Sequence, residues 1–136
     1  SYTLAAPMTA NILIVEDEFL IACEMQSILE DNGYRCVGIA SDLPAAERYF
    51  EERLDLAFVD LNLRDGLTGP EIGKRLSSSG VPVIFITANP ALLGGGIAGT
   101  IGVLTKPTDE DDLLSAVRYG LDRGKAAPPP RLQLFG

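Results

Sequence analysis

Five short runs of consecutive apolar residues lie along the chain, separated by longer segments with a different periodicity. The three strongest runs cover residues 12–15, 56–59 and 83–86, and two weaker runs cover 37–40 and 101–104. Continuous rather than alternating apolar residues are typical of strands that are covered on both faces, as in a parallel sheet. The pattern therefore predicts five parallel strands between two layers of helices.

The segments between these runs repeat apolar residues every three or four positions, as amphipathic helices do. The four stripes are Ile21, Met25, Ile28 and Leu29; Ala46, Tyr49 and Phe50; Ile72 and Leu76; and Leu113, Leu114, Val117 and Leu121. Gly33 is placed to end the first helix, and Thr-x-x-acid patterns at Thr68 and Thr108 predict capping boxes for the last two. This alternation of strands and helices predicts a three-layer α/β/α sandwich with right-handed crossovers.

The connection between the fourth and fifth strands, residues 88–100, departs from this pattern. It contains Pro90 and four glycines, Gly94, Gly95, Gly96 and Gly99. Each glycine costs a helix about 1 kcal/mol relative to alanine. We therefore expect a short turn or a mobile loop at this place instead of a full helix.

Polar residues that could take part in binding or catalysis follow four of the five predicted strands. In chain order they are Glu16 and Asp17, Asp60, Thr87, and Lys106. Ligands of an open parallel sheet bind beyond the carboxyl ends of its strands, so we expect these side chains to meet at one edge. Taken singly, each has an ordinary interpretation as an acid at a helix start, a turn or capping residue, or a solvated lysine. Their coincidence at one edge of the sheet favours a functional site.

The chemistry of this set indicates phosphoryl transfer. Three carboxylates held together repel one another, and ligands that are all oxygen atoms suit Mg²⁺. With a cation among them, Asp60 can attack a phosphoryl group and form an aspartyl phosphate. Lys106 supplies a second positive charge, and the Thr87 hydroxyl can donate to a phosphoryl oxygen.

Composition narrows the classes of function. The 136 residues fit one domain, and 11 basic against 19 acidic residues give a net charge of −8, which disfavours binding to nucleic acid. No apolar run approaches the roughly 18 residues of a membrane span. The absence of histidine excludes histidine-based catalysis and a role as a phosphohistidine carrier. Cys23 and Cys36 lie in apolar segments and are interpreted as buried free thiols, in keeping with a reducing cytoplasm.

The sequence predicts a folded domain over residues 10–124 with an irregular segment on each side. Residues 1–9 are expected to be a disordered or artificial N-terminal segment, with Met8 as the native start. Residues 125–136 are expected to be a flexible tail, because the three prolines from 128 to 130 favour extended, exposed backbone. The tail also carries three apolar side chains that could dock on a partner, Leu132, Leu134 and Phe135.

These motifs resemble the receiver domain of bacterial response regulators, from about Asn11 to Arg123. The marks of the resemblance are the Glu16-Asp17 pair, Asp60, Gly69 nine residues later, Thr87 in Phe-Ile-Thr-Ala, and Lys106-Pro107. Each mark is weak alone, but their order and spacing are specific. The resemblance implies a flavodoxin-like, five-stranded parallel sheet with strand order 2-1-3-4-5, and a stand-alone receiver of a two-component phosphorelay.

The resemblance also implies how the acidic residues act. Asp60 would accept a phosphoryl group from the phosphohistidine of a histidine kinase or a histidine phosphotransferase. Asp17, Asp60 and the backbone carbonyl of Asn62 would bind Mg²⁺ directly, and Glu16 would act through a metal-bound water. The chain would then catalyse only its own phosphorylation and dephosphorylation, without turning over an outside substrate.

The switch residues implied by the resemblance are Thr87, Val103 and Pro107. Thr87 and Lys106 would hold the phosphoryl group, and the Lys106-Pro107 bond would be cis. Phosphorylation would repack the face formed by the 88–100 connection, the fifth strand and the last helix. That face would bind an unidentified downstream protein or a second copy in a homodimer. Val103 stands where the family usually has Tyr or Phe, and valine lacks the aromatic ring that usually couples to the threonine.

Three alternatives stay open. A phosphatase of the haloacid dehalogenase type also uses an aspartate after a strand, but it needs a second acid where this chain has Asn62. A receiver-like interaction module that works without phosphate would explain Val103 and the glycine-rich connection. The chain could also be the receiver fragment of a longer regulator. Only about 13 residues follow the last predicted helix, too few for a helix-turn-helix module, so direct DNA binding is not expected.

Overall fold

The protein is seen here in a computed structural model that describes residues 9–122 and 125–136. Among these residues six strands form one sheet, in the order β2-β1-β3-β4-β5-β6. The parallel strands are β1 (Asn11–Val15), β2 (Arg35–Ala40), β3 (Leu56–Val59), β4 (Val83–Thr87) and β5 (Gly102–Thr105). The predicted sandwich and the predicted order 2-1-3-4-5 are confirmed for these five strands. None of the described helices is long and apolar enough to cross a membrane.

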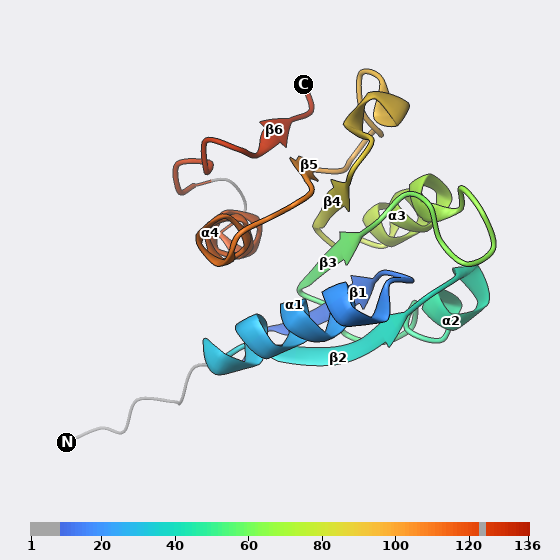
Figure 1. The fold of residues 1–136 in the computed structure, drawn as a ribbon, viewed down its shortest axis with the longest axis horizontal. Coiled ribbons are helices and arrows are strands. Elements are labelled where there is room, and N and C mark those ends of the chain that lie inside the picture. Colours follow the sequence, from blue (N-terminus) through green and yellow to red (C-terminus); the bar gives the residue numbers. More distant parts are fainter. Residues whose placement is uncertain (1–8, 123–124) are drawn as a thin grey trace.

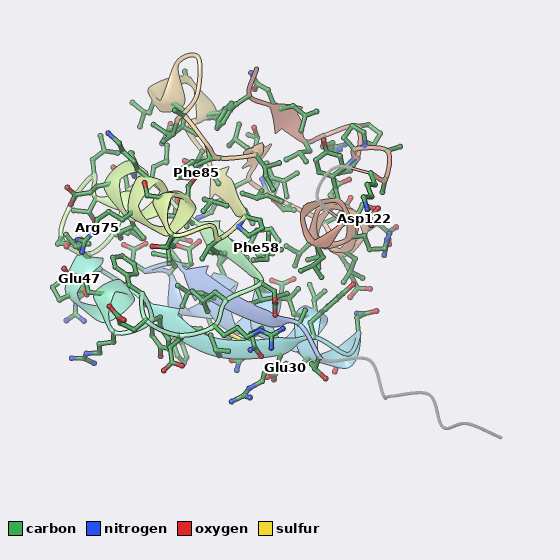
Figure 2. The ribbon with its side chains drawn as sticks, turned by 180° about the vertical axis from the view of Figure 1, so that it is seen from behind. Glu30, Glu47, Phe58, Arg75, Phe85 and Asp122 are labelled. Atoms are coloured by element: carbon green, nitrogen blue, oxygen red, sulfur yellow. The ribbon has the colours of Figure 1, made fainter. Side chains whose placement is uncertain are left out.

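Helices cover both faces of the sheet (Figure 1). The helices α1 (Phe19–Asp31) and α4 (Glu110–Leu121) lie on one face, and α2 (Leu43–Glu47) and α3 (Gly69–Ser78) lie on the other. Each pair closes its own apolar cluster over the sheet. Phe58 belongs to the cluster under α1 and α4, and Phe85 belongs to the cluster under α2 and α3. Both side chains lie inside the molecule and are labelled in Figure 2. This double cover explains why residues 12–15, 56–59 and 83–86 are apolar at every position.

The C-terminal segment corrects the prediction of a flexible tail. Here β6 (Gln133–Leu134) pairs antiparallel with β5 and becomes the outer strand of the sheet. Leu132 is buried in the cluster under α1 and α4, and Phe135 packs against the opposite cluster. Two apolar anchors on opposite faces of one strand outweigh the preference of the preceding prolines for open backbone. The predicted N-terminal segment falls almost entirely outside the described residues.

Both predicted capping boxes are wrong in detail. Thr68 is the N-cap residue of α3, but its hydroxyl donates to Asp65 at 2.7 Å and makes no capping hydrogen bond to the helix. At the start of α4 the cap is Asp109, whose carboxylate accepts from the Asp112 N–H at 2.8 Å. Thr108 lies one residue too early and its buried hydroxyl has no partner among the described residues. The helix α2 is also shorter than its apolar stripe, because it ends at Glu47 and the chain continues in turns.

The glycine-rich connection forms a short turn, as predicted. A single 3₁₀ turn, η1 (Pro90–Leu93), is followed by irregular backbone up to β5. Gly94, Gly96 and Gly99 have positive φ angles, which a continuous helix does not allow. Leu93 anchors the turn in the cluster under α2 and α3. The fourth connection of the sheet is therefore a turn and a loop, with Leu93 and Thr100 buried and Ile97 packed against the same cluster as Leu93.

Candidate functional site

Four strands deliver polar side chains to one edge of the sheet. Glu16 follows β1, Asp60 follows β3, Thr87 ends β4, and Lys106 follows β5. The parallel register places the ends of these strands side by side. The predicted set therefore meets at the carboxyl edge, although Glu16, Asp60 and Thr87 are buried and Asp17 is exposed.

Lys106 joins the two buried carboxylates. Its Nζ lies 2.7 Å from Glu16 Oε1 and 2.8 Å from Asp60 Oδ2. The other oxygen of each carboxylate accepts a backbone N–H, from Glu18 at 3.1 Å and from Leu61 at 2.7 Å. Asp60 is thus held by a charged donor and a neutral donor, with its carboxylate fixed in one orientation.

The site also brings three carboxylates within reach of one cation. Oxygen atoms of Glu16, Asp17 and Asp60 all lie within 4.8 Å of one another. Hard oxygen donors of this kind fit Mg²⁺, which binds a few carboxylates and keeps its remaining positions for water or phosphate oxygens. Asn62, the fourth predicted ligand residue, lies two residues after Asp60 and is exposed. The donor set therefore fits the cation that the sequence suggests.

Burial and charge shift the protonation of this cluster. Burial raises the pKa of Glu16 to about 7, and the Asp60 carboxylate adds to the rise, while Lys106 and the Glu18 N–H oppose it. For Lys106, burial lowers the pKa, but the hydrogen bonds to Asp60 and Glu16 outweigh it and the pKa is raised. Lys106 therefore stays charged beside the two buried side chains of Glu16 and Asp60.

The three predicted switch residues lie at the end of β4, on β5 and in the turn that follows β5. The Thr87 hydroxyl oxygen accepts the Asn89 N–H at 3.0 Å, which ties the end of β4 to the start of the glycine-rich connection. Val103 is 1% exposed and stands opposite Phe85 in the pairing of β5 with β4. Pro107 follows Lys106 through a cis peptide bond, as predicted.

The structure gives a physical reason for a glycine nine residues after Asp60. A Cβ at this position would overlap the Asp60 carbonyl oxygen and lie 2.6 Å from Leu61 Cα. The Gly69 N–H also donates to the Leu61 carbonyl at 3.0 Å. The first residue of α3 is therefore fitted against the backbone that carries Asp60. The sequence marks Gly69 by its spacing, but only the structure gives the physical reason.

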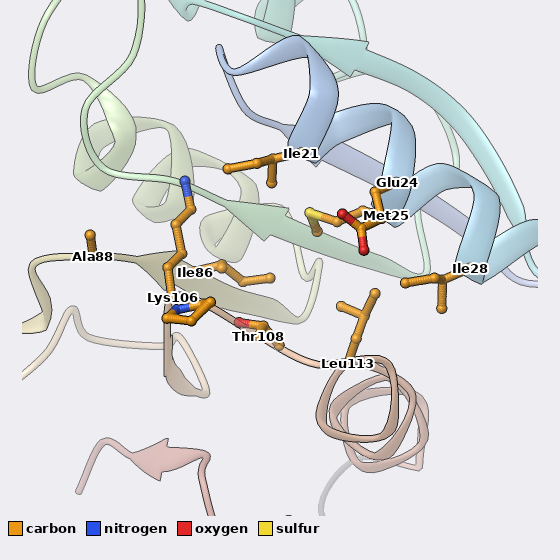
Figure 3. A pocket seen from close by; sticks show the side chains of 10 residues that line it. Ile21, Glu24, Met25, Ile28, Ile86, Ala88, Lys106, Thr108 and Leu113 are labelled. Atoms are coloured by element: carbon orange, nitrogen blue, oxygen red, sulfur yellow. The ribbon is translucent and has the colours of Figure 1, made fainter.

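An apolar groove beside the cluster was not predicted. It has a volume of about 330 Å³ and lies between α1, the end of β4 and the β5–α4 loop. Figure 3 shows Ile21, Met25 and Ile28 of α1 facing Leu113 across it, with Lys106 along its wall. The α1 stripe marks these residues as core, and periodicity alone does not tell a closed core from an open groove.

Comparison with known proteins defines the class. A family model for the response regulator receiver domain matches residues 12–118, so the chain belongs to that family. It is 40% identical over 90 residues to the phyllosphere-induced regulator PhyR of Methylorubrum extorquens, covering 64% of this chain and 34% of that protein. It is 32% identical over 116 residues to sporulation initiation phosphotransferase F of Bacillus subtilis, covering 82% and 93%.

A solved structure agrees with the fold. The solution structure of the PhyR receiver domain of Erythrobacter litoralis has a TM-score of 0.76 and 28% identity, and covers 89% of this chain and 96% of that one. The chain spans about a third of the length of the first curated relative, PhyR, and 52% of the sensory transduction protein RegX3 of Mycobacterium tuberculosis. Receiver domains are the signalling modules of two-component systems rather than enzymes for an outside substrate.

Proposed function

We propose that this receiver accepts a phosphoryl group on Asp60 from the phosphohistidine of a histidine kinase or a histidine phosphotransferase. The observation that supports this most is the setting of the Asp60 carboxylate, held by Lys106 and the Leu61 N–H beside two further carboxylates. An ordinary turn aspartate needs neither a half-buried lysine nor neighbouring acids. The 136 residues contain no histidine, so the donor histidine lies outside them.

In the proposed reaction an Asp60 oxygen attacks the phosphorus in line with the bond to the donor imidazole. The new O–P bond forms as the P–N bond breaks. The electron pair of that bond stays on the ring nitrogen, and the donor leaves as neutral imidazole because its other ring nitrogen carries a proton. Asp17, Asp60 and the Asn62 carbonyl would hold Mg²⁺, with Glu16 acting through a water. When bound, the cation neutralises charge on the phosphoryl oxygens.

Lys106 and Thr87 act on the group once it is attached. Lys106 already lies 2.8 Å from Asp60 Oδ2, so its ammonium can follow a phosphoryl oxygen with a small movement. The Thr87 hydroxyl can donate to a second oxygen after a rotation about its Cα–Cβ bond. Both contacts place positive charge or a proton donor where the transferred group carries negative charge.

The donor is proposed to dock at the start of α1 and the groove beside it. Phe19 and Leu20 are 73% and 82% exposed, one turn from the acidic cluster. Large apolar side chains with such exposure favour a binding surface. The adjacent groove runs along the wall that contains Lys106. A helix that carries the phosphohistidine can rest its apolar face there and present its imidazole to Asp60.

Phosphorylation is proposed to shift the balance between two packings of the face formed by η1, β5 and α4. This face would serve a downstream protein or a second copy of the chain. Because Val103 has no ring to swing, the response passes through Thr87 and the connection that follows it. The exchange would take place in the cytoplasm, where free thiols such as Cys23 and Cys36 stay reduced.

The test is the intact mass of the protein after incubation with acetyl phosphate, with and without Mg²⁺. We expect one phosphoryl adduct that needs Mg²⁺, is absent in Asp60→Asn, and persists in the control Asp111→Asn, an exposed acid on α4. Failure of folded wild-type protein to form the adduct would contradict the proposal. That result would favour a phosphate-independent interaction module, which the buried Val103 also suits.

A further inference from the structure

The free edge of β5 is closed by the last residues of the chain. In β6, Leu134 pairs with Gly102 and Gln133 with Val103, and the Phe135 N–H donates to the Ile101 carbonyl at 3.0 Å. Figure 1 shows β6 running beside β5 at the end of the sheet, above α4. We refer to residues 131–135 as the C-terminal strap. It takes up the edge that a sixth strand of any origin would use.

The strap is anchored on both faces of the sheet. Leu132 is 6% exposed and lies in the cluster under α1 and α4. The ring of Phe135 packs on the other side, with its centroid 6.4 Å from that of Phe85 and the planes inclined at 45°. Arg131 adds an exposed ion pair with Asp112 of α4 at 3.3 Å, which contributes little. The two apolar side chains therefore hold the strap against the sheet, and we call the surface of β5 and the clusters that receives them the seat.

Two glycines shape this seat. A Cβ on Gly102 would overlap the Gln133 carbonyl oxygen, so β5 admits the strap only because this residue lacks a side chain. Gly96, with a φ of 109°, lies under the ring of Phe135, and a Cβ there would overlap that ring. The strap is thus in contact with β5 and also with the glycine-rich connection that begins at Thr87.

The seat is connected to the Asp60 site through one hydrogen bond and one strand. The Thr87 hydroxyl oxygen accepts the Asn89 N–H, and the chain from Asn89 leads through η1 to Gly96. On β4, Phe85 lies two residues before Thr87 and touches the Phe135 ring. A rotation of the Thr87 hydroxyl toward Asp60 gives up the bond from Asn89 and frees the start of the connection.

We propose that the C-terminal strap is a displaceable intramolecular strand whose seat on β5 is lost when Asp60 is phosphorylated. The inference rests on the proposed function and names its output. Turning of Thr87 toward the phosphoryl group moves the connection, and Gly96 then no longer fits under Phe135. Release opens the β5 edge, where Gly102 and Val103 can pair with an extended segment of a partner.

The size of the strap suits a reversible contact. Its strand has two residues, and Leu134 remains 43% exposed. So short an edge strand adds few hydrogen bonds, and it persists because the tether keeps it at an effective concentration of about millimolar. Rebinding after loss of the phosphoryl group is intramolecular and needs no further partner.

Amide hydrogen exchange of the full chain, read by mass spectrometry on the peptides that contain residues 101–105 and 131–136, tests the proposal. The states are untreated protein, protein with Mg²⁺, and protein with Mg²⁺ and acetyl phosphate, with the adduct measured in the same samples. In the phosphorylated fraction we expect exchange in both peptides to be about tenfold faster or more. Asp60→Asn should show no such change. Phe135→Ala should exchange fast in every state, and its neighbour control Leu134→Ala should behave like wild type.

The outcomes distinguish the release of the strap from the phosphorylation of Asp60. An adduct without faster exchange makes the strap a permanent strand and overturns this inference, while the proposed function stands. The absence of an adduct on folded protein overturns both. Exchange in Phe135→Ala that equals wild type also overturns the inference, because the strap would then be held by something other than the seat described here.

Discussion

Replacement of Gly69 by alanine is the sharpest test of how the fold carries Asp60. The added Cβ would overlap the Asp60 carbonyl oxygen and lie 2.6 Å from Leu61 Cα and 2.8 Å from the Asp60 carbonyl carbon. These are backbone atoms of a buried loop, so they cannot turn aside as the end of a flexible side chain can. Either α3 or the loop must move, and the hydrogen bond from Gly69 to Leu61 is stretched.

The expected cost follows from this geometry. Overpacking in a protein core usually costs about 1–3 kcal/mol, and a clash with backbone belongs at or above the upper end of that range. For a domain of this size a loss of about 3 kcal/mol lowers the melting temperature by roughly 10 °C. Because the displaced loop carries Asp60, the rate of adduct formation should fall as well, even at temperatures where the variant is folded.

Urea unfolding followed by circular dichroism measures the effect, with Gly95→Ala as the matched control. Gly95 lies in the glycine-rich connection, and a Cβ there has nothing within 4 Å. We expect this control to stay within about 0.5 kcal/mol of wild type. A free energy of unfolding for Gly69→Ala that equals the control would refute the argument, since it would mean that the loop behind Asp60 yields without cost.

Three further results are expected. Asp109→Ala should destabilise the protein by about 1 kcal/mol in urea unfolding through loss of the α4 cap, whereas Thr108→Val should be neutral or stabilising because its hydroxyl is buried without a described partner. Without metal, the stability contributed by Glu16, whose pKa is raised from 4.5 to about 7, is fully present below pH 4.5 and lost as the pH rises through 7. Wild type should therefore lose stability relative to Glu16→Gln across that window, and equal pH profiles would contradict the assignment. Lys106→Met should cost about 3–5 kcal/mol at pH 8, as it leaves Glu16 and Asp60 facing each other, and Mg²⁺ should recover part of that in a thermal shift assay.

The sheet could be predicted because its signal is local. Each of the five parallel strands is a run of apolar residues, and the observed strands begin and end within two residues of the runs. The carboxyl ends of parallel strands share one edge of the sheet. This topology alone predicts that the residues at those ends lie together, namely Glu16, Asp60, Thr87 and Lys106. Their proposed roles in phosphoryl transfer go beyond geometry and depend on the adduct experiment.

The C-terminal strand could not be predicted from the sequence, because it depends on contacts between distant segments. Nothing near Leu132 or Phe135 marks a strand. Their packing is decided by β5, some 30 residues earlier, and by two clusters whose residues come from most of the chain. The predicted cap of α4 is wrong for a local reason. Thr108 and Asp109 are both good capping residues, and the choice between them is fixed by the rotation that turns Leu113 and Val117 to the sheet. A shift of one residue leaves the local pattern plausible and the cap misplaced.

The strand order has a consequence for how the chain folds as it leaves the ribosome. The first strand made, β1, ends up in the middle of the sheet between β2 and β3. It can pair on both sides once about 60 residues have emerged, and α1 can then already cover part of one face, but the cluster on that face also needs Leu113 and Val117 of α4. At a synthesis rate of about 5–20 residues per second, that cluster stays incomplete for several seconds. A nascent chain stalled after β4 would lack the cover of α4 over Phe58 and Ile84 of β3 and β4, and would be a substrate for chaperones rather than a smaller version of the domain.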